Sequence, residues 1–120
     1  MVNFALQFEG NPYVYGGTSL TNGADCSGFV MSVFANFGYS LPRVAAAQCE
    51  ASTKKDISQL EPGDLVFYGS GYIDHVALYI GDGKIIHASN AATGIKISDY
   101  DYEKPAAVGT FCLLYTSPSP

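Results

Sequence analysis

Two apolar runs flank a glycine-rich turn in the second half of the chain, in the stretch HVALYIGDGKIIHAS over residues 75–89. The Gly-Asp-Gly sequence at its centre is a strong hairpin signal, because glycine adopts the positive φ angles that tight turns require. A three-residue loop over 81–83 predicts a register in which Ile80 pairs with Lys84. This feature restricts the fold most, because it commits the centre of the chain to antiparallel sheet.

Helices are predicted before this hairpin, and short strands around and after it. Apolar residues at helical spacing predict three helices, over 2–9, from Asp25 to a stop at Gly38, and over 44–51. Short apolar or alternating runs predict further strands over 65–68, 94–98 and 107–111. Helices followed by a run of short strands are typical of an α+β fold with an antiparallel sheet.

The composition of the 120 residues fits one globular domain, because 48% are hydrophobic and only 14% are charged. The net charge is −5 and the six Lys and Arg residues are scattered, so nucleic acid is not an expected partner. No apolar run approaches the ~20 residues that span a bilayer, which argues against membrane insertion. The first ten residues lack a secretory signal, which leaves open a cytoplasmic protein or one module of a longer exported chain.

The last nine residues, CLLYTSPSP, differ abruptly in character from the rest. They resemble the translation of a sequencing adapter, so we expect a domain over 1–111 and a non-native tail over 112–120. The alternative is the start of an ordinary Pro/Ser-rich linker. On the adapter interpretation, Cys112 has no functional role.

One of the three cysteines, Cys26, stands between Asp25 and Ser27 where the second helix is predicted to begin. Asp25 is suited to cap that helix, and the positive end of the helix dipole then favours a thiolate at Cys26. The negative charge of Asp25 acts against this, so a cationic partner would help. From the helix alone, a small buried hydrophobic residue is as good an interpretation of Cys26 as a nucleophile. The cysteine spacing matches no CxxC metal motif and requires no disulfide.

The only two histidines, His75 and His87, fall on the two strands of the predicted hairpin. With a three-residue loop, His87 lies opposite Ala77 and His75 opposite Ser89, so the two rings are diagonal neighbours on one face. A two-residue loop would place them on opposite faces. On one face, one imidazole can take the thiol proton while the other orients it. Two alternatives stay open: unrelated sheet histidines, or a zinc site of Cys26 with both histidines, for which no fourth ligand is evident.

Six short motifs together resemble the NlpC/P60 cell-wall peptidases, which are papain-like cysteine hydrolases. Each motif alone would be weak, but they occur in the family's order and at its usual spacing over about residues 11–89. The motifs are PYVYGG (12–17), DCSGFV (25–30), LPR (41–43), PGDLVFY (62–68), HVALYIG (75–81) and IIHA (85–88).

This resemblance implies a papain-like α+β fold, with N-terminal helices packed on a central antiparallel sheet. It also implies hydrolysis of peptidoglycan stem peptides at the γ-D-glutamyl–diamino acid bond. The protein would be a monomer that needs no metal or organic cofactor and is secreted or associated with the cell wall.

The same resemblance assigns roles to residues. Cys26 is the nucleophile, His75 the base and His87 the residue that orients the base. The positions that shape the substrate pocket and hold the free amine of the stem peptide are Tyr13, Asp25 and Ser27.

Two other functions are compatible with the same scaffold. The first is a non-catalytic module that binds the cell wall, although such a module would have no use for a nucleophile and a base together. The second is an amidase or acyltransferase with the same catalytic residues and a different acceptor. Arg43 could meet a substrate carboxylate or simply lie on the surface, and Cys49 is expected to be a passive packing residue.

Overall fold

The computed structural model describes residues 1–111. Its helices are α1 (Val2–Leu6), α2 (Cys26–Ala35), α3 (Ala45–Ala51) and the 3₁₀-helix η1 (Ile57–Gln59). Its strands are β1 (Thr18–Ser19), β2 (Gly23–Ala24), β3 (Thr53–Lys55), β4 (Leu65–Tyr68), β5 (His75–Gly81), β6 (Lys84–Asn90), β7 (Gly94–Asp99) and β8 (Ala107–Thr110). The predicted tail over 112–120, with Cys112, lies outside the described residues. Within the described range, no helix is long and apolar enough to cross a bilayer.

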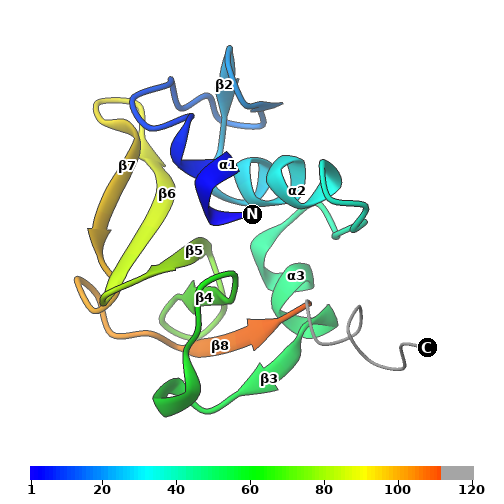
Figure 1. Ribbon diagram of the computed structural model, residues 1–120, viewed down its shortest axis with the longest axis vertical. Helices are drawn as coiled ribbons and strands as arrows, with labels where there is room; N and C mark the ends of the chain where they lie inside the picture. Colours follow the sequence, from blue (N-terminus) through cyan, green and yellow to red (C-terminus); the bar gives the residue numbers. More distant parts are fainter. Residues whose placement is uncertain (112–120) are drawn as a thin grey trace.

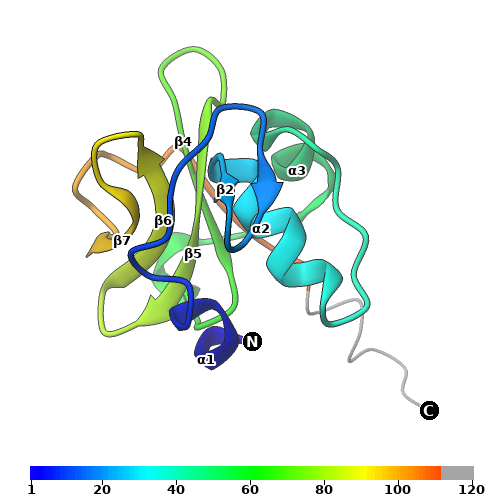
Figure 2. The same cartoon turned by 90° about the horizontal axis from the view of Figure 1, so that it is seen from above.

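A six-stranded sheet with strand order β3-β8-β4-β5-β6-β7 is the centre of the molecule, and each neighbouring pair in it is antiparallel. Figure 1 shows this sheet curving round the helices, from β7 on one side to β3 on the other. In Figure 2, α2 and α3 lie together on one side of the strands. The predicted α+β fold, with N-terminal helices packed on a central antiparallel sheet, is therefore confirmed.

The predicted helices and strands are present, and their ends differ by a few residues. α1 ends at Leu6 rather than Glu9, because the chain then turns and the Gly10 N–H bonds to the Ile95 carbonyl at 2.8 Å. The Gly- and Thr-rich segment over 13–24, for which no helix or strand is predicted, contains the short β1–β2 pair. The sequence does not predict β3, because Thr-Lys-Lys has no apolar pattern and becomes a strand only by pairing with β8.

The β5–β6 hairpin closes differently from the prediction. Lys84 pairs with Gly81 and not with Ile80, so the loop has two residues instead of three. Ile80 forms a β-bulge, which adds one residue to β5, and the next pair is Tyr79 with Ile85. The bulge offsets the shorter loop, so the strands regain the predicted register before they reach the histidines.

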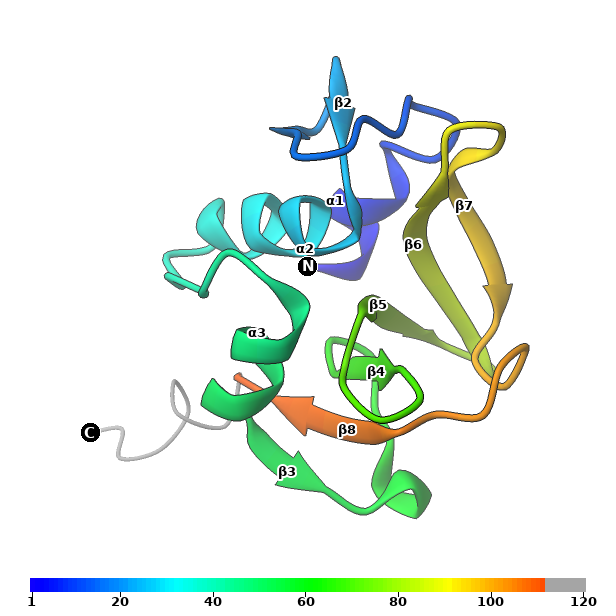
Figure 3. The same cartoon turned by 180° about the vertical axis from the view of Figure 1, so that it is seen from behind.

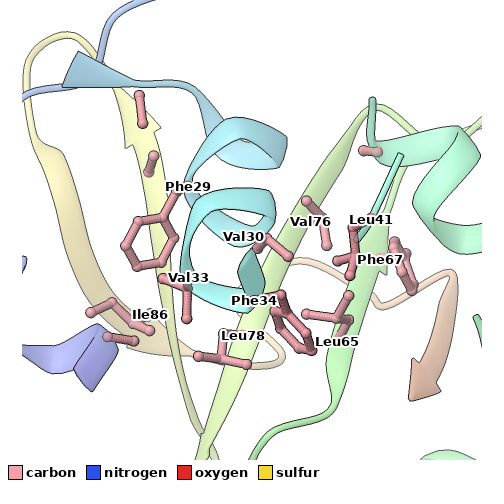
Figure 4. Packing of buried hydrophobic residues seen from close by; sticks show 14 of the residues in the cluster. Phe29, Val30, Val33, Phe34, Leu41, Leu65, Phe67, Val76, Leu78 and Ile86 are labelled. Carbon is pink, nitrogen blue, oxygen red and sulfur yellow. The ribbon is translucent and has the colours of Figure 1, made fainter. Parts of the chain in front are cut away.

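The main core lies between α2 and the sheet. Figure 4 shows side chains of α2 directed at β4, β5 and β6. The buried residues of α2 are Phe29, Val30, Val33 and Phe34, and those of the three strands include Leu65, Phe67, Val76, Leu78 and Ile86. Seen from behind, α3 lies beside β8 at the other end of the sheet (Figure 3). This packing fixes α2, and with it Cys26, against the strands.

The opposite face of the sheet carries a second, smaller buried cluster. It consists of Val66, Tyr68, Ala77 and Ile85. Because side chains alternate along a strand, His75 and His87 lie on this second face, in step with Ala77 and Ile85. The core of α2 and the two histidines are therefore on different faces, and they can meet only where β5 begins.

Replacing Phe29 by alanine should destabilise the fold strongly, because this ring is fully buried between α2 and the sheet. We expect a loss of about 3–5 kcal/mol in the free energy of unfolding, measured by urea denaturation. The matched control is Phe37→Ala, because Phe37 is 39% exposed and should cost much less. Equal losses in the two variants would mean that α2 does not bury the face described above.

Candidate active site

Asp25 caps α2 and makes Cys26 the first residue of the helix. The backbone of Asp25 is extended (φ −88°, ψ −177°), and its Oδ1 accepts a hydrogen bond from the Gly28 N–H at 2.8 Å. The predicted cap is therefore confirmed. The thiol of Cys26 stands at the helix end where backbone N–H groups have no partner within the helix.

The loop over 13–24 lies directly against this helix start. The Gly16 N–H donates to Asp25 Oδ2 at 3.0 Å, and the Asp25 N–H donates to the Gly17 carbonyl at 3.1 Å. A Cβ on Gly28 would stand 2.1 Å from the Gly17 oxygen, so only glycine permits this contact. The loop is thus held beside the thiol from two sides.

Arg43 joins the LPR segment to the same carboxylate. Its Nη1 and Nη2 donate to the two oxygens of Asp25 at 3.1 and 3.0 Å, and Nη1 also donates to Ser27 Oγ at 3.0 Å. Burial of Asp25 would raise the pKa of its carboxyl, but the hydrogen bonds from Arg43, Gly28 and Gly16 outweigh burial and lower that pKa. Arg43 is the cationic partner that the sequence left unidentified, and it belongs to the site rather than to the general surface.

The side chain of Gln48, in α3, links the LPR segment to α2. Its side chain is fully buried, and Nε2 donates to the carbonyls of Ser27 at 3.1 Å and of Pro42 at 2.9 Å. Ser27, which follows Cys26, and Pro42, which precedes Arg43, therefore accept hydrogen bonds from the same nitrogen of Gln48. The sequence alone does not identify Gln48, because a glutamine in a short helix is an ordinary surface residue.

The environment of the Cys26 thiol combines opposing effects. Burial raises its pKa most, and the negative charge of Asp25 adds to the increase, whereas hydrogen bonding to the backbone groups of Val76, Ser27 and Cys26 itself acts in the other direction. The hydrogen bonds at the helix start therefore lower the pKa of the thiol as expected, but burial and the charge of Asp25 outweigh them. The net pKa of Cys26 is raised. Because the sulfur contacts Val76, it lies beside β5. Val76 directly follows His75 in the sequence.

The two histidine rings contact each other directly. His75 Nε2 and His87 Nδ1 are 2.7 Å apart, and the ring centroids are 5.0 Å apart. The prediction that both rings share one face of the hairpin is confirmed. On its far side, His87 Nε2 lies 2.9 Å from Ser98 Oγ on β7. The sequence gives no signal for Ser98, because it lies outside the hairpin whose register could be predicted.

Both imidazoles are held in the neutral form at pH 7. The pKa of His87 is lowered to about 3, first by burial and then by repulsion from protonated His75 and from Lys96. Burial also lowers the pKa of His75, although Asp74 partly opposes this. With the Cys26 pKa raised, the resting site is a neutral thiol beside a neutral imidazole pair.

Two tyrosines enclose the histidines on this face. The Tyr68 ring centroid lies 5.9 Å from that of His75, and the Tyr102 centroid lies 5.4 Å from that of His87. Tyr102, in the connection from β7 to β8, is 48% exposed, whereas His87 beneath it is only 1% exposed. Tyr102 thus separates His87 from solvent, a role that no sequence pattern indicates.

The predicted pocket residues all lie around Cys26. Ser27 is buried, and its hydroxyl accepts from Arg43 and donates to Asp25 Oδ1 at 3.4 Å, which is the fifth hydrogen bond to that carboxylate. Tyr13 is half-buried, and its pKa is raised first by burial and then by repulsion from Cys26, in its thiolate form, and from Asp25. Their roles toward a substrate stay predictions.

A metal site is not supported by the side chains present. Among residues 1–111, no three His, Cys, Asp or Glu side chains converge so that they could hold a metal ion. Cys26 and Cys49 are both free thiols. The zinc alternative for Cys26 with His75 and His87 therefore has no geometric basis in the described part of the chain.

Known proteins resemble this chain in sequence and in structure. The sequence model of the NlpC/P60 family matches residues 10–110. A γ-D-glutamyl-L-lysine dipeptidyl-peptidase of Bacillus subtilis (strain 168) is 41% identical over 104 residues, which cover 81% of this chain and 35% of that protein. The chain spans about a third of the length of the curated relatives it matches.

Two solved structures are similar to this chain over most of its length. The crystal structure of an NlpC/P60 family protein from Bacillus cereus ATCC 10987 superposes with a TM-score of 0.86 at 33% identity, over 92% of this chain and 38% of that one. RipD from Mycobacterium tuberculosis, described as a non-catalytic NlpC/p60 domain protein adapted to peptidoglycan binding, superposes with a TM-score of 0.79 at 25% identity, over 92% of this chain and 94% of that one.

The Asp25–Arg43 pair should stabilise the fold in a pH-dependent way. Because the folded pKa of Asp25 lies below that of the unfolded chain, its contribution is complete above about pH 4 and is lost as the pH falls through the folded pKa. We expect Asp25→Asn to lower the free energy of unfolding by about 1 kcal/mol at pH 7, and this difference from the wild type should shrink in acid. Urea titrations at several pH values test this, with Glu9→Gln as a surface control. A difference that does not change with pH would contradict the ion-pair assignment.

His87 should stay uncharged far into the acid range. Because its pKa is lowered to about 3, the C2 proton signal of its ring should keep its neutral chemical shift as the pH falls through the ordinary range near 6.5. An NMR titration measures this directly, and His87→Asn identifies the signal because only His75 then remains. A midpoint near 6.5 for His87 would show that the ring is not buried as described.

Proposed function

The chain belongs to the NlpC/P60 family, and we propose that it is a cysteine endopeptidase that hydrolyses peptidoglycan stem peptides. The observation that carries the proposal is the convergence of a thiol and an imidazole pair. Cys26, at a capped helix start, contacts the backbone of Val76, and the neighbouring His75 is held by His87 at 2.7 Å. A nucleophile, a base and a group that orients the base are the parts that acyl transfer by a cysteine requires.

The proposed reaction begins from the neutral pair. Since His75 Nε2 is engaged by His87, Nδ1 is the nitrogen that takes the thiol proton as the sulfur attacks the scissile carbonyl. The backbone N–H of Cys26 at the helix start stabilises the oxyanion. The imidazolium of His75 then protonates the leaving amine, and water hydrolyses the remaining thioester with His75 as the base. Apart from the substrate and the hydrolytic water, the reacting groups are side-chain and backbone groups of the chain.

We propose the γ-D-glutamyl–diamino acid bond as the target, on the basis of the similar Bacillus subtilis dipeptidyl-peptidase. We propose that Tyr13, Asp25 and Ser27 form the wall of the pocket that receives the residue before this bond. The Asp25 oxygens already accept from Arg43, Gly16 and Gly28, so a substrate amine would meet a partly neutralised carboxylate. Asp25 therefore shapes the pocket at least as much as it attracts the amine. We propose action by a monomer at the cell wall, outside the cytoplasm.

A non-catalytic binding module is the second candidate, because RipD shares the fold and is described as non-catalytic. The raised pKa of Cys26 and the lowered pKa of His75 also mean that the thiolate is not the resting form. Against this candidate, a binding module has no need for the ordered contact between His75 and His87. An amidase or acyltransferase would share the same catalytic residues and differ only in its substrates.

Substitution of the catalytic residues should separate these functions. We expect Cys26→Ala to abolish cleavage of a synthetic L-Ala-γ-D-Glu-L-Lys peptide, His75→Ala to reduce kcat by about 10³, and His87→Ala by a smaller factor, about 10². Cys49→Ala is the matched control, because Cys49 is a second free thiol on α3 and should leave the rate unchanged. Product formation is followed by chromatography and mass spectrometry.

The isomeric peptide with an α-linked glutamate tests the bond assignment and should not be cleaved. If the wild type binds peptidoglycan fragments but cleaves neither peptide, the binding module is the better interpretation. Transfer of the acyl group to an added amine in preference to water would favour the acyltransferase.

A further inference from the structure

Ser98 lies one strand beyond the histidine pair. It is part of β7, where it pairs with Ile85 of β6, and its hydroxyl reaches diagonally to His87 Nε2 at 2.9 Å. His87 is only 1% exposed, so water cannot replace this partner without a rearrangement. Both ring nitrogens of His87 are therefore engaged, one by His75 and the other by Ser98.

The short contact between the histidines requires one proton between His75 Nε2 and His87 Nδ1. If His75 carries it, His75 Nδ1 has a free lone pair, and His87 carries its own proton on Nε2. If His87 carries it, the neutral His75 is protonated on Nδ1 and cannot accept a proton from the thiol. Only the first arrangement supplies the base that the proposed function needs.

The two arrangements make different demands at His87 Nε2. In the first, a buried N–H must find an acceptor, and Ser98 Oγ provides it. In the second, Nε2 presents only a lone pair to the serine hydroxyl. A buried N–H without an acceptor is rarer and less tolerated than an acceptor without a donor. Loss of the hydroxyl would therefore penalise the first arrangement more.

We propose that Ser98 is a positioning residue that selects the productive tautomer of the histidine pair. By accepting a hydrogen bond from His87 Nε2, Ser98 leaves His87 Nδ1 as an acceptor for His75 and so leaves His75 Nδ1 free. The catalytic part of this inference rests on the proposed function, but the tautomer is a property of the free protein.

The tautomers can be measured without substrate. In ¹⁵N-labelled protein at pH 7, long-range ¹H–¹⁵N spectra report which ring nitrogen carries a proton. We expect protonated Nε2 and unprotonated Nδ1 on both histidines of the wild type, a mixed or reversed pattern in Ser98→Ala, and the wild-type pattern in Ser98→Thr, which keeps a hydroxyl. A proton on His87 Nδ1 in the wild type, or an unchanged pattern in Ser98→Ala, would overturn the proposal.

Kinetics provide the second arm of the test. We expect Ser98→Ala to lower kcat for the γ-linked peptide by about tenfold with little change in KM, and Ser98→Thr to restore most of it. Ser52→Ala is the matched control, because Ser52 is a buried serine whose hydroxyl donates to the Cys49 carbonyl at 2.8 Å, beside the far edge strand β3. An unchanged kcat in Ser98→Ala would count against the proposal. If the wild type cleaves no peptide at all, the proposed function fails, and the spectra still decide the role of Ser98.

Discussion

The carboxylate of Asp25 joins three separate segments at one point. It accepts from Gly28 in α2, from Gly16 in the preceding loop and from Arg43 in the LPR segment. A carboxylate has acceptor positions for about four hydrogen bonds, and the five that Asp25 accepts use them completely. The same group has an electrostatic effect, because the negative charge of Asp25 raises the pKa of Cys26 even though Asp25 is paired with Arg43. The cap of α2, the electrostatics of the thiol and the proposed pocket wall therefore depend on this single group.

Burial decides the charge state of the catalytic pair. It raises the pKa of Cys26 and lowers those of both histidines, and the hydrogen bonds at the helix start do not reverse the first effect. A charged pair would have to be stabilised by groups that act only when the proton moves, such as the oxyanion-binding N–H and the substrate itself. For the proposed reaction, these pKa directions favour proton transfer that accompanies the attack over a thiolate that exists beforehand. Tyr102 contributes by keeping solvent away from His87.

The parts of the site that lie close together in sequence could be predicted, and those that depend on distant packing could not. The cap at Asp25 and the shared face of His75 and His87 follow from helix and strand periodicity, and both are confirmed. Arg43, Gln48 and Ser98 were inaccessible to the same reasoning, because their contacts with Asp25, Ser27 and His87 span 18, 21 and 11 positions of the chain. The net pKa of Cys26 was also inaccessible, because the helix contribution is a local property, whereas burial depends on the whole fold. The loop length of the hairpin was wrong for a related reason, since a bulge inside the strand leaves no clear sequence signal.

The error in the hairpin shows which quantity matters for the chemistry. A three-residue loop without a bulge and a two-residue loop with one bulge give the same register at the histidines, so the number of residues between them is the constraint and the turn type is not. The same condition holds one strand further, because His87 and Ser98 also meet through a hairpin. The pairing in that second hairpin is irregular between Ala88 and Asn90. Ser98 pairs with Ile85, where the register is regular. His75, His87 and Ser98 thus form a diagonal line of contacts across three consecutive strands, offset by two residues at each step. A single-residue insertion in either hairpin that is not offset by a bulge would break this line, even if every side chain in it were retained.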